Sequence, residues 1–469
     1  MSILEIIIAI GIISLICTPV IQVLYSLHPA YMLDMVKDVP SVLLSKSTDI
    51  QGVSYYTDGA LRIVHKRGGM REVQNLSYPN VVEGVGTDTV FNRHTCRDFN
   101  KNFNADKNPI LYTYTLEDLS IGGDTKFTGL SFVGNSLLIS ADSSSTTLPD
   151  LYSFRLDTPL YNSENPFDAT KPILIPTKGE NTGPGISQLQ SFGTHILTSN
   201  TGVKNQANIF RIGLHDAVSA ATTEGANAIS TVDSISKQLD LSIPGSNSTT
   251  TPITKISMYA NGRVYVGTEK SVLPEIFIFN AKNGTVEGSI ETDYGINDLL
   301  ILNDMLIVAG PRDPEIEIFS LTTFQKIGAY DLAGGSGNAK VLNIFGDDLY
   351  IGRTKGGNEL EILTIQRSEE RPLSLFTHIL EPIFNKKISW SVDKILKYED
   401  ILMLFTANEY QEFEMFNVTN NISFALNSTY KIDLPDRVSD AVCFKNSIWM
   451  TYKNIDNANP FKLGSLVFI

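Results

Sequence analysis

Residues able to carry out catalysis are few and scattered along this sequence. Its six histidines occur at positions 28, 65, 94, 195, 215 and 378, and they show no His–carboxylate spacing that suits a metal. The chain has no HExxH, CxxC, GxSxG or P-loop motif. Residues 334–337 (GGSG) follow a predicted strand, but no helical pattern follows them, so they indicate a turn rather than a phosphate-binding loop. We therefore expect no catalytic residue, no metal ligand and no cofactor, and expect the protein not to be an enzyme.

The chemically unusual residue is Glu5, a carboxylate at the edge of a long apolar run. Residues 6–27 form a 22-residue segment of the length that crosses a bilayer core of about 30 Å. An ionisable residue at such a place is a candidate functional residue. The α-amine of Met1 lies one helical turn away, and in a bundle of staggered helices Glu5 would meet this amine on a neighbouring subunit. Because the attraction grows as the dielectric constant falls, we interpret Met1 and Glu5 as residues of filament assembly.

Two simpler interpretations of this segment remain. A cleaved secretory signal would need a basic first region and a small-residue cleavage site, but no Lys or Arg precedes Lys37, and residues 26–28 (SLH) make a poor site. A plain membrane anchor accounts for every residue except Glu5. The anchor therefore stays open beside the assembly hypothesis.

The stretch SILEIIIAIGIISLI resembles the mature N-terminus of type IV pilins and pseudopilins. These proteins begin with a residue that is usually N-methylated, have Glu at the fifth position, and continue as an apolar helix that often contains Gly and Pro. Met1, Glu5, Gly11 and Pro19 match that pattern. The resemblance covers residues 1 to about 27. It implies that Met1 is exposed by removal of a short basic leader, and that Gly11 and Pro19 belong to the helix core and its bend.

Three regions are expected along the chain. Pro29 and Pro40 disfavour a longer helix, so residues 1–40 are predicted to be the pilin-like helix and its exit. Residues 41–108 are predicted to be a small stalk or collar, in which Asp58-Gly59 between β-prone runs indicates a hairpin. A basic cluster there is interpreted as a solvated loop face rather than a ligand site; it consists of His65, Lys66, Arg67 and Arg71.

Residues 109–469 repeat themselves. One run recurs seven times at intervals of 42 to 68 residues, as NSLLIS, THILTS, GRVYVG, DMLIVA, DDLYIG, DILMLF and NSIWMT. A second β-prone run follows each copy, as in PEIFIFNA and NELEILTI. Seven units with room for four strands each predict a mainly β fold, a seven-bladed β-propeller behind a single N-terminal helix. The last unit ends on its third strand, so residues 110–118 (ILYTYTLED) are predicted to supply the fourth and close the ring.

Several details of this propeller follow from the sequence. Residues 315–319 (EIEIF) alternate at period two, which predicts one buried and one wet face. Residues 215–250 are small and polar and are expected to be a surface loop with room for one short helix. Trp390 and Trp449 are expected on strands, in the core. Residues 346–365 loosely resemble a propeller repeat of the form G-N/D-x-Y-V followed by E-L-x-I-x-D, found in prokaryotic surface proteins with pilin-like N-termini.

Charge and cysteine content limit the partners. A net charge of −14 and a pI of about 5.0 argue against nucleic acid and anionic membrane surfaces. Because Cys17 lies in the apolar segment, the three cysteines allow at most one intramolecular disulfide, Cys96–Cys443, and two buried free thiols are favoured. Sequons permit an external location without establishing one; they occur at Asn75, Asn247, Asn283, Asn417, Asn421 and Asn427.

The expected function is that of a structural subunit of an extracellular, type IV pilus-like filament. The N-terminal helix would be inserted in the membrane before assembly and then form the core of a homopolymer. The propeller would be displayed outside for adhesion to a host or neighbouring cell surface. The alternative is a membrane-anchored propeller enzyme, lactonase or quinoprotein-like, with a metal or cofactor in its channel. A viral-type attachment protein is disfavoured by the low cysteine content.

Overall fold

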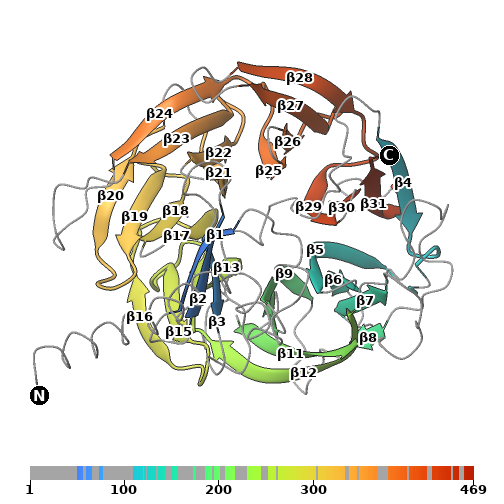
Figure 1. Ribbon diagram of the computed structural model, residues 1–469, viewed down its shortest axis with the longest axis horizontal. Helices are drawn as coiled ribbons and strands as arrows, with labels where there is room; N and C mark the ends of the chain where they lie inside the picture. The colour runs from blue at the N-terminus through green and yellow to red at the C-terminus, as the bar shows by residue number, and fades with distance from the viewer. Residues whose placement is uncertain are drawn as a thin grey trace, which may run out of the picture.

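The computed structural model describes residues 50–55, 60–65, 73–77, 109–119, 121–122, 124–133, 136–143, 150–155, 173–175, 185–192, 195–200, 206–216, 230–244, 252–259, 262–302, 305–332, 337–345, 348–366, 379–398, 401–419, 425–444, 447–453 and 459–468. All 31 regular elements in these residues are β-strands. Seven four-stranded antiparallel sheets are arranged around a central axis as the blades of a β-propeller (Figure 1). The predicted seven-bladed fold is therefore confirmed. The predicted N-terminal helix lies outside the described residues, and within them no helix is long and apolar enough to cross a membrane.

We number the blades in chain order. Blades 1 and 2 consist of β5 (Thr125–Val133), β6 (Ser136–Ser143), β7 (Leu151–Arg155) and β8 (Ile173–Ile175), and of β9 (Ile186–Phe192), β10 (His195–Asn200), β11 (Gln206–Asp216) and β12 (Ser230–Ser242). Blades 3 and 4 consist of β13 (Ile253–Tyr259), β14 (Arg263–Thr268), β15 (Ile276–Asn280) and β16 (Val286–Ile290), and of β17 (Asp298–Leu302), β18 (Met305–Ala309), β19 (Ile316–Ser320) and β20 (Lys326–Tyr330). Blades 5 and 6 consist of β21 (Ala339–Phe345), β22 (Asp348–Arg353), β23 (Leu360–Gln366) and β24 (Ile379–Lys386), and of β25 (Val392–Tyr398), β26 (Ile401–Thr406), β27 (Phe413–Thr419) and β28 (Ala425–Ile432). Blade 7 consists of β29 (Val438–Phe444), β30 (Ser447–Tyr452), β31 (Phe461–Val467) and β4 (Ile110–Thr115).

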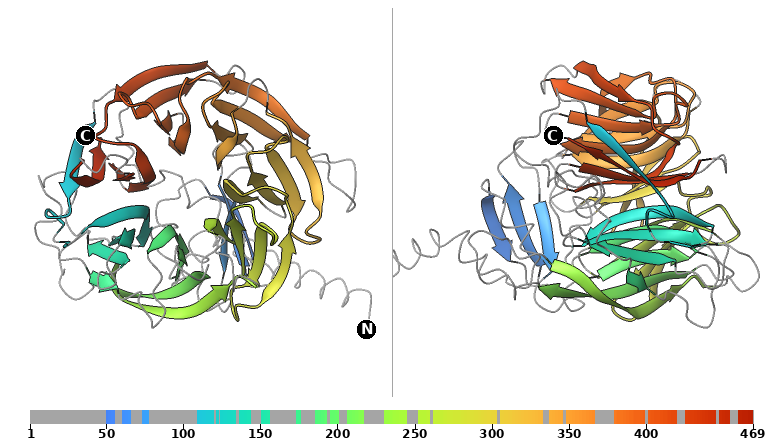
Figure 2. Two further views of the ribbon diagram at one scale, coloured as in Figure 1. Left: turned by 180° about the vertical axis from the view of Figure 1, so that it is seen from behind. Right: turned by 90° about the vertical axis from the view of Figure 1, so that its right-hand side faces the viewer.

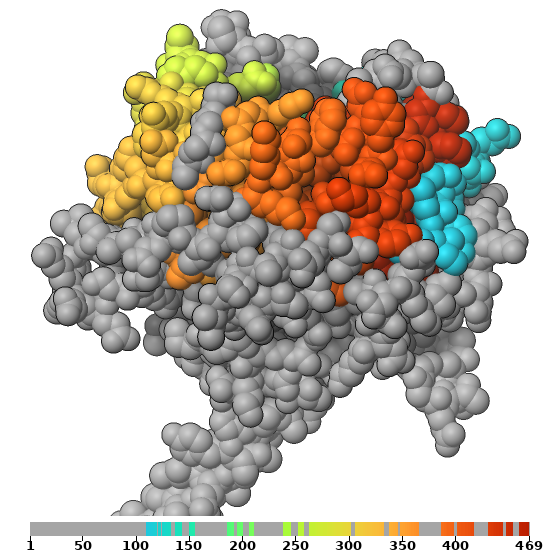
Figure 3. Space-filling model, turned by 90° about the horizontal axis from the view of Figure 1, so that it is seen from above, coloured from blue at the N-terminus to red at the C-terminus, as the bar shows by residue number. Residues whose placement is uncertain are grey.

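The ring is closed by strands from both ends of the propeller. β4 pairs antiparallel with β31, so that Leu111 lies opposite Leu466 and Tyr114 opposite Leu463. Figure 3 shows the cyan β4 against the red C-terminal strands at the rim. The first strand of every blade contacts the first strand of the next, including β29 with β5. The predicted closing strand is confirmed, and the pairing covers a sheet edge that would otherwise be open.

The hydrophobic core lies between the blades. One cluster joins Leu300 and Ile318 of blade 4 to Leu342 and Ile351 of blade 5, and similar clusters occupy other blade boundaries. A middle strand is covered on both faces, which explains why β18 reads as the continuous apolar run MLIVA and is buried at all five positions.

Covering of both faces also corrects the predicted wet face of residues 315–319. Glu315 and Glu317 are each only 7% exposed, because the neighbouring blade covers the face expected to meet water. The alternation in this strand therefore separates an apolar buried face from a polar buried face. Because the carboxylates of Glu315 and Glu317 are buried, they need hydrogen-bond or charged partners.

The described part of residues 215–250 differs from the expected surface loop. β11 continues to Asp216 and β12 runs from Ser230 to Ser242, and the two strands pair along their length with two register shifts. Residues 215–216 therefore end the third strand of blade 2, and residues 230–242 are its fourth, outermost strand. An outermost strand can contain small polar residues as a loop does, and this is why composition alone indicated a loop.

A carboxylate recurs immediately before the third strand in five blades, as Asp150, Glu275, Glu315, Glu359 and Glu412, all buried. The four glutamates accept backbone N–H groups from the segment that follows the fourth strand, for example from Leu332 to Glu315 at 3.0 Å and from Leu434 to Glu412 at 2.8 Å. The acidic residue of the sequence repeat thus fixes the connection from each of these blades to the next.

A separate three-stranded sheet precedes the propeller. It consists of β1 (Ile50–Tyr55), β2 (Ala60–His65) and β3 (Val73–Ser77), in the order β1-β2-β3. β1 and β2 pair antiparallel on either side of Asp58-Gly59, with Tyr55 opposite Leu61. Figure 2 shows this sheet in blue beside one face of the ring.

Candidate functional site

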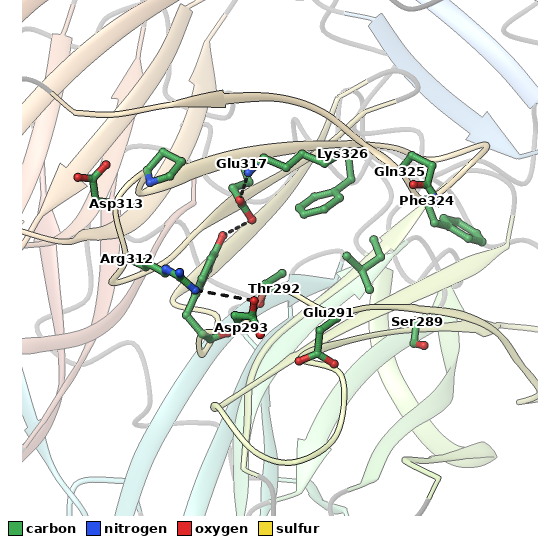
Figure 4. Close-up of a pocket in the computed structure, with 14 residues that line it drawn as sticks. Ser289, Glu291, Thr292, Asp293, Arg312, Asp313, Glu317, Phe324, Gln325 and Lys326 are labelled. Atoms are coloured by element: carbon green, nitrogen blue, oxygen red, sulfur yellow. Dashed lines mark hydrogen bonds and ion pairs between the residues drawn. The ribbon is translucent and has the colours of Figure 1, made fainter.

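A polar pocket lies between the outer parts of blades 3 and 4 (Figure 4). Its cavity volume is about 530 Å³. The walls come from the end of β16, the connection to β17, the turn between β18 and β19, β19 itself, and the start of β20.

Glu317 is the best-anchored charge of the pocket. The hydroxyl of Tyr294 donates a hydrogen bond to its Oε2 at 2.7 Å, and the ammonium of Lys326 pairs with its Oε1 (Figure 4). Burial, together with the adjacent Glu317 carboxylate, raises the pKa of Tyr294. The phenol therefore stays protonated and holds the carboxylate in place.

Tyr294 is itself positioned by close packing on the turn of the neighbouring blade. A Cβ atom added at Gly310 would lie 2.0 Å from Cε2 of Tyr294, so only glycine leaves room for the ring at this position. Blade 4 thus accommodates the tyrosine of the connection from blade 3, and the two blades build the pocket together.

The mouth of the pocket carries unbalanced acidic charge. Its lining contains the carboxylates Glu291, Asp293, Asp313 and Glu317, against the two cations Arg312 and Lys326. Nζ of Lys270 lies 3.7 Å from carboxylate oxygens of both Glu291 and Asp293, so four carboxylates face three cations and one acidic charge is in excess. Arg312 reaches Asp293 at 3.8 Å, but the side chains are 60% and 70% exposed, so this ion pair contributes little to stability. The pocket therefore favours a cationic or hydrogen-bonding group over an anion.

One group of acidic side chains near the pocket has metal-like spacing. Carboxylate oxygens of Asp313, Glu315 and Asp331 lie within 4.8 Å of one another. Glu315 already accepts the N–H of Leu332 and lies 3.5 Å from Nη2 of Arg353. The carboxylate of Glu315 therefore already has partners, because it serves the structural role of the repeated glutamate.

The assembly residues predicted from sequence, Met1, Glu5, Gly11 and Pro19, lie outside the described residues. Of the basic cluster, only the backbone of His65 is described, at the end of β2. Trp449 is fully buried in β30, as expected for a core residue. Trp390, expected on a strand, instead lies just before β25.

Cys443 corrects the expectation of free thiols, because it is disulfide-bonded. The chain has two other cysteines, Cys17 and Cys96, both outside the described residues. The choice of free thiols rested on the low cysteine count, which carries no information about whether two of them meet in the fold.

Sequence reasoning did not find the pocket. Tyr294 belongs to a connection and Glu317 to a strand, and about twenty positions separate them, so no local motif joins them. The available signal was Glu317 itself, an acidic residue in a strand that the repeat places in the middle of a blade.

No protein-family model matches the chain, and no curated protein sequence matches it. Among solved structures, the chain is similar to the β-propeller domain of Cps50 (Swd1) from Myceliophteria thermophila, with a TM-score of 0.51 and 9% identity over 74% of this chain and 98% of that one. A structure of the mitotic checkpoint complex has a TM-score of 0.49 at 8% identity, covering 79% and 97% of the two chains. BamB from Moraxella catarrhalis has 0.43 at 10% identity, covering 73% and 85%. The first likeness agrees with the propeller fold and carries no information about function.

Proposed function

We propose that this chain is the subunit of an extracellular, type IV pilus-like filament that displays a β-propeller on its outside. The observation that carries the proposal is Glu5, a carboxylate four positions from Met1 at the start of a 22-residue apolar segment. Paired with the α-amine of a neighbouring copy, it gives the apolar helices a reason to polymerise in one register. The subunit resides in the membrane through this helix before it joins the filament.

The closure of the ring supports this arrangement. The chain preceding residue 109 connects to β4, which is the outermost strand of blade 7 (Figure 1). A propeller tethered at its rim can be carried on a filament with its closure intact. The disulfide at Cys443 also supports a location outside the reducing cytosol.

Filament formation is tested by shearing intact cells and imaging the released fraction by electron microscopy. Mass spectrometry of the subunit establishes whether Met1 is its N-terminal residue and so carries the α-amine. Glu5→Ala should abolish filaments and leave thermal unfolding of the propeller unchanged. Gln22→Ala, which removes a neutral polar group from the same segment, should leave filaments intact. Filaments formed equally well by Glu5→Ala would refute the proposal.

We assign adhesion to the pocket between blades 3 and 4, because its excess carboxylates would select cationic or hydrogen-bonding groups on another surface. The double variant Glu291→Gln/Asp293→Asn removes two exposed charges and should reduce adhesion of filament-bearing cells. Glu409→Gln, an exposed change in blade 6, is the matched control. Equal adhesion by all three strains would rule out the pocket as the contact surface.

A further inference from the structure

The first strand of most blades begins with the same irregularity. A register shift near its start leaves one residue out of the ladder, and the residues left out are Thr128, Ser187, Thr254, Lys340, Asp393 and Ser439. A bulge re-aims its side chain and is a designed feature of a strand rather than a defect. At four of the six bulges the residue carries a hydroxyl.

Two of these hydroxyls link neighbouring blades. Thr128 donates to the carbonyl of Ile186 in blade 2, and Ser439 donates to the carbonyl of Phe127 in blade 1 at 3.4 Å. In blades 5 and 6 the hydroxyls are replaced by Lys340 and Asp393, which form an ion pair across the blade boundary. The repeat therefore changes from neutral to charged at one place on the ring.

Two further cations from blade 7 converge on the same carboxylate. Nη2 of Arg437 lies 2.9 Å from Oδ2 of Asp393, and Nζ of Lys453 lies 3.2 Å from the same oxygen. We call Lys340, Arg437 and Lys453, gathered over Asp393, the cationic rim. The backbone holds it together, since the N–H of Lys453 donates to the carbonyl of Arg437 at 2.8 Å.

Charge in the cationic rim is not balanced. The side chain of Asp393 is 3% exposed, whereas the three cations are 28–30% exposed and lie on the solvent side of it. Among the described side chains of the other inner strands, the ion pairs are single, as in Lys394 with Asp440 and Lys255 with Asp298. The next carboxylate along the chain, Asp436, accepts the N–H of Arg437.

The titration of these groups is consistent with that imbalance. Burial alone would raise the pKa of Asp393, but Lys453, Lys340 and Arg437 together hold it below its usual value. Burial lowers the pKa of Lys453; Asp393 opposes this shift, while Lys340 and Arg437 add to it. A half-buried excess of positive charge is costly unless an anion completes it.

We propose that the cationic rim binds the anionic group, phosphate or carboxylate, of a small ligand at one end of the propeller's inner strands. Arg437 and the two lysines supply donors on the solvent side, and the buried Asp393 fixes their positions from below. The site differs in sign from the acidic pocket between blades 3 and 4 and does not depend on filament assembly.

The test is isothermal titration calorimetry of the full chain in non-ionic detergent at pH 7 and low chloride. Inorganic phosphate and succinate are titrated in separate arms. Saturable binding of either one supports the proposal, and the tighter arm identifies the ligand chemistry. Lys453→Met should weaken binding at least tenfold, and Lys453→Arg should largely restore it.

Lys394→Met is the matched control, because it removes an inner-strand cation from a single ion pair. It should bind the anion as the unaltered chain does. Lys255→Met, from the pair with Asp298, serves if the first control does not unfold cooperatively. No saturable binding in either arm, or equal losses in Lys453→Met and the control, would overturn the proposal.

Discussion

The ring of Tyr114 lies stacked on that of Trp449, with centroids 6.0 Å apart and planes inclined by 14°. Tyr114 belongs to β4 and Trp449 to β30, so the contact joins the first strand of the propeller to its last blade. Burial raises the pKa of Tyr114 to about 12, with the hydrogen bond to Ser465 opposing the shift. The seam of the ring is therefore a packed, desolvated interface as well as a backbone ladder.

Removal of the closing strand should destabilise the whole propeller. We expect a fragment of residues 109–469 to unfold cooperatively on heating, and a fragment of residues 120–469 to unfold at much lower temperature or aggregate. The physical reason is that β31 would lose its ladder and expose an edge. Circular dichroism and tryptophan fluorescence measure the difference, and equal melting temperatures would contradict it. Both fragments lack Cys96, so the disulfide does not enter the comparison.

Glu359 and Glu412 occupy the same position in blades 5 and 6 but titrate differently. Burial raises the pKa of both, but four backbone N–H groups outweigh it at Glu359 and lower its pKa. At Glu412 the N–H of Leu434 does not offset burial, Asp433 and Asp436 add to it, and the pKa is raised. At pH 7, Glu359→Gln should therefore lower the free energy of unfolding by about 2 kcal/mol, and Glu412→Gln by less.

The pH dependence of the two variants should differ in sign. A lowered folded pKa means that Glu359 stabilises the fold above the unfolded pKa of about 4.3, and that this is lost as the pH falls through the folded value. A raised folded pKa means that Glu412 contributes stability below about 4.3 that is lost as the pH rises through its folded value. Urea unfolding at pH 7 and pH 4 measures the free energy of unfolding of both variants. The difference in this free energy between Glu359→Gln and Glu412→Gln should be smaller at pH 4 than at pH 7. A wider gap at pH 4 would contradict this assignment.

The disulfide at Cys443 should contribute to stability. We expect Cys443→Ser to lower the free energy of unfolding by about 2–4 kcal/mol, because the unfolded chain without the cross-link has a higher conformational entropy. Cys17→Ser is the control and should have no such effect. Peptide mapping without reductant should identify Cys96 as the partner, and recovery of an unmodified Cys443 thiol would show the bond to be absent.

Substitution by alanine should have different effects on stability at Gly310 and at Gly328. A Cβ at Gly310 would meet the ring of Tyr294 at 2.0 Å, whereas one at Gly328 has its nearest neighbour, Cδ1 of Ile318, at 3.6 Å. Gly310→Ala should therefore lower the free energy of unfolding by about 1–3 kcal/mol and displace Tyr294 from Glu317. Gly328→Ala should change it by less than about 0.5 kcal/mol. Thermal unfolding of both variants checks this, and similar losses would show that the tyrosine moves freely.

The repeat made the architecture predictable. Each unit carries its own turn and its own apolar run, and five of the seven carry an acidic residue before the third strand, so blade number and strand order follow from local patterns. The closing strand was predictable because the last unit lacked one. Composition misled at residues 230–242, because an outermost strand and a loop can contain the same small polar residues.

The sequence by itself determined the number of blades, the order of the strands and the unusual place of Glu5. Only the tertiary structure decided which polar residues meet, because neighbouring blades bring together residues far apart in the chain. Glu317 joins Tyr294 across one boundary, and Asp393 collects Lys340, Arg437 and Lys453 across two others. Such contacts depend on side chains re-aimed by bulges and on the packing of one sheet on the next, which no local pattern records.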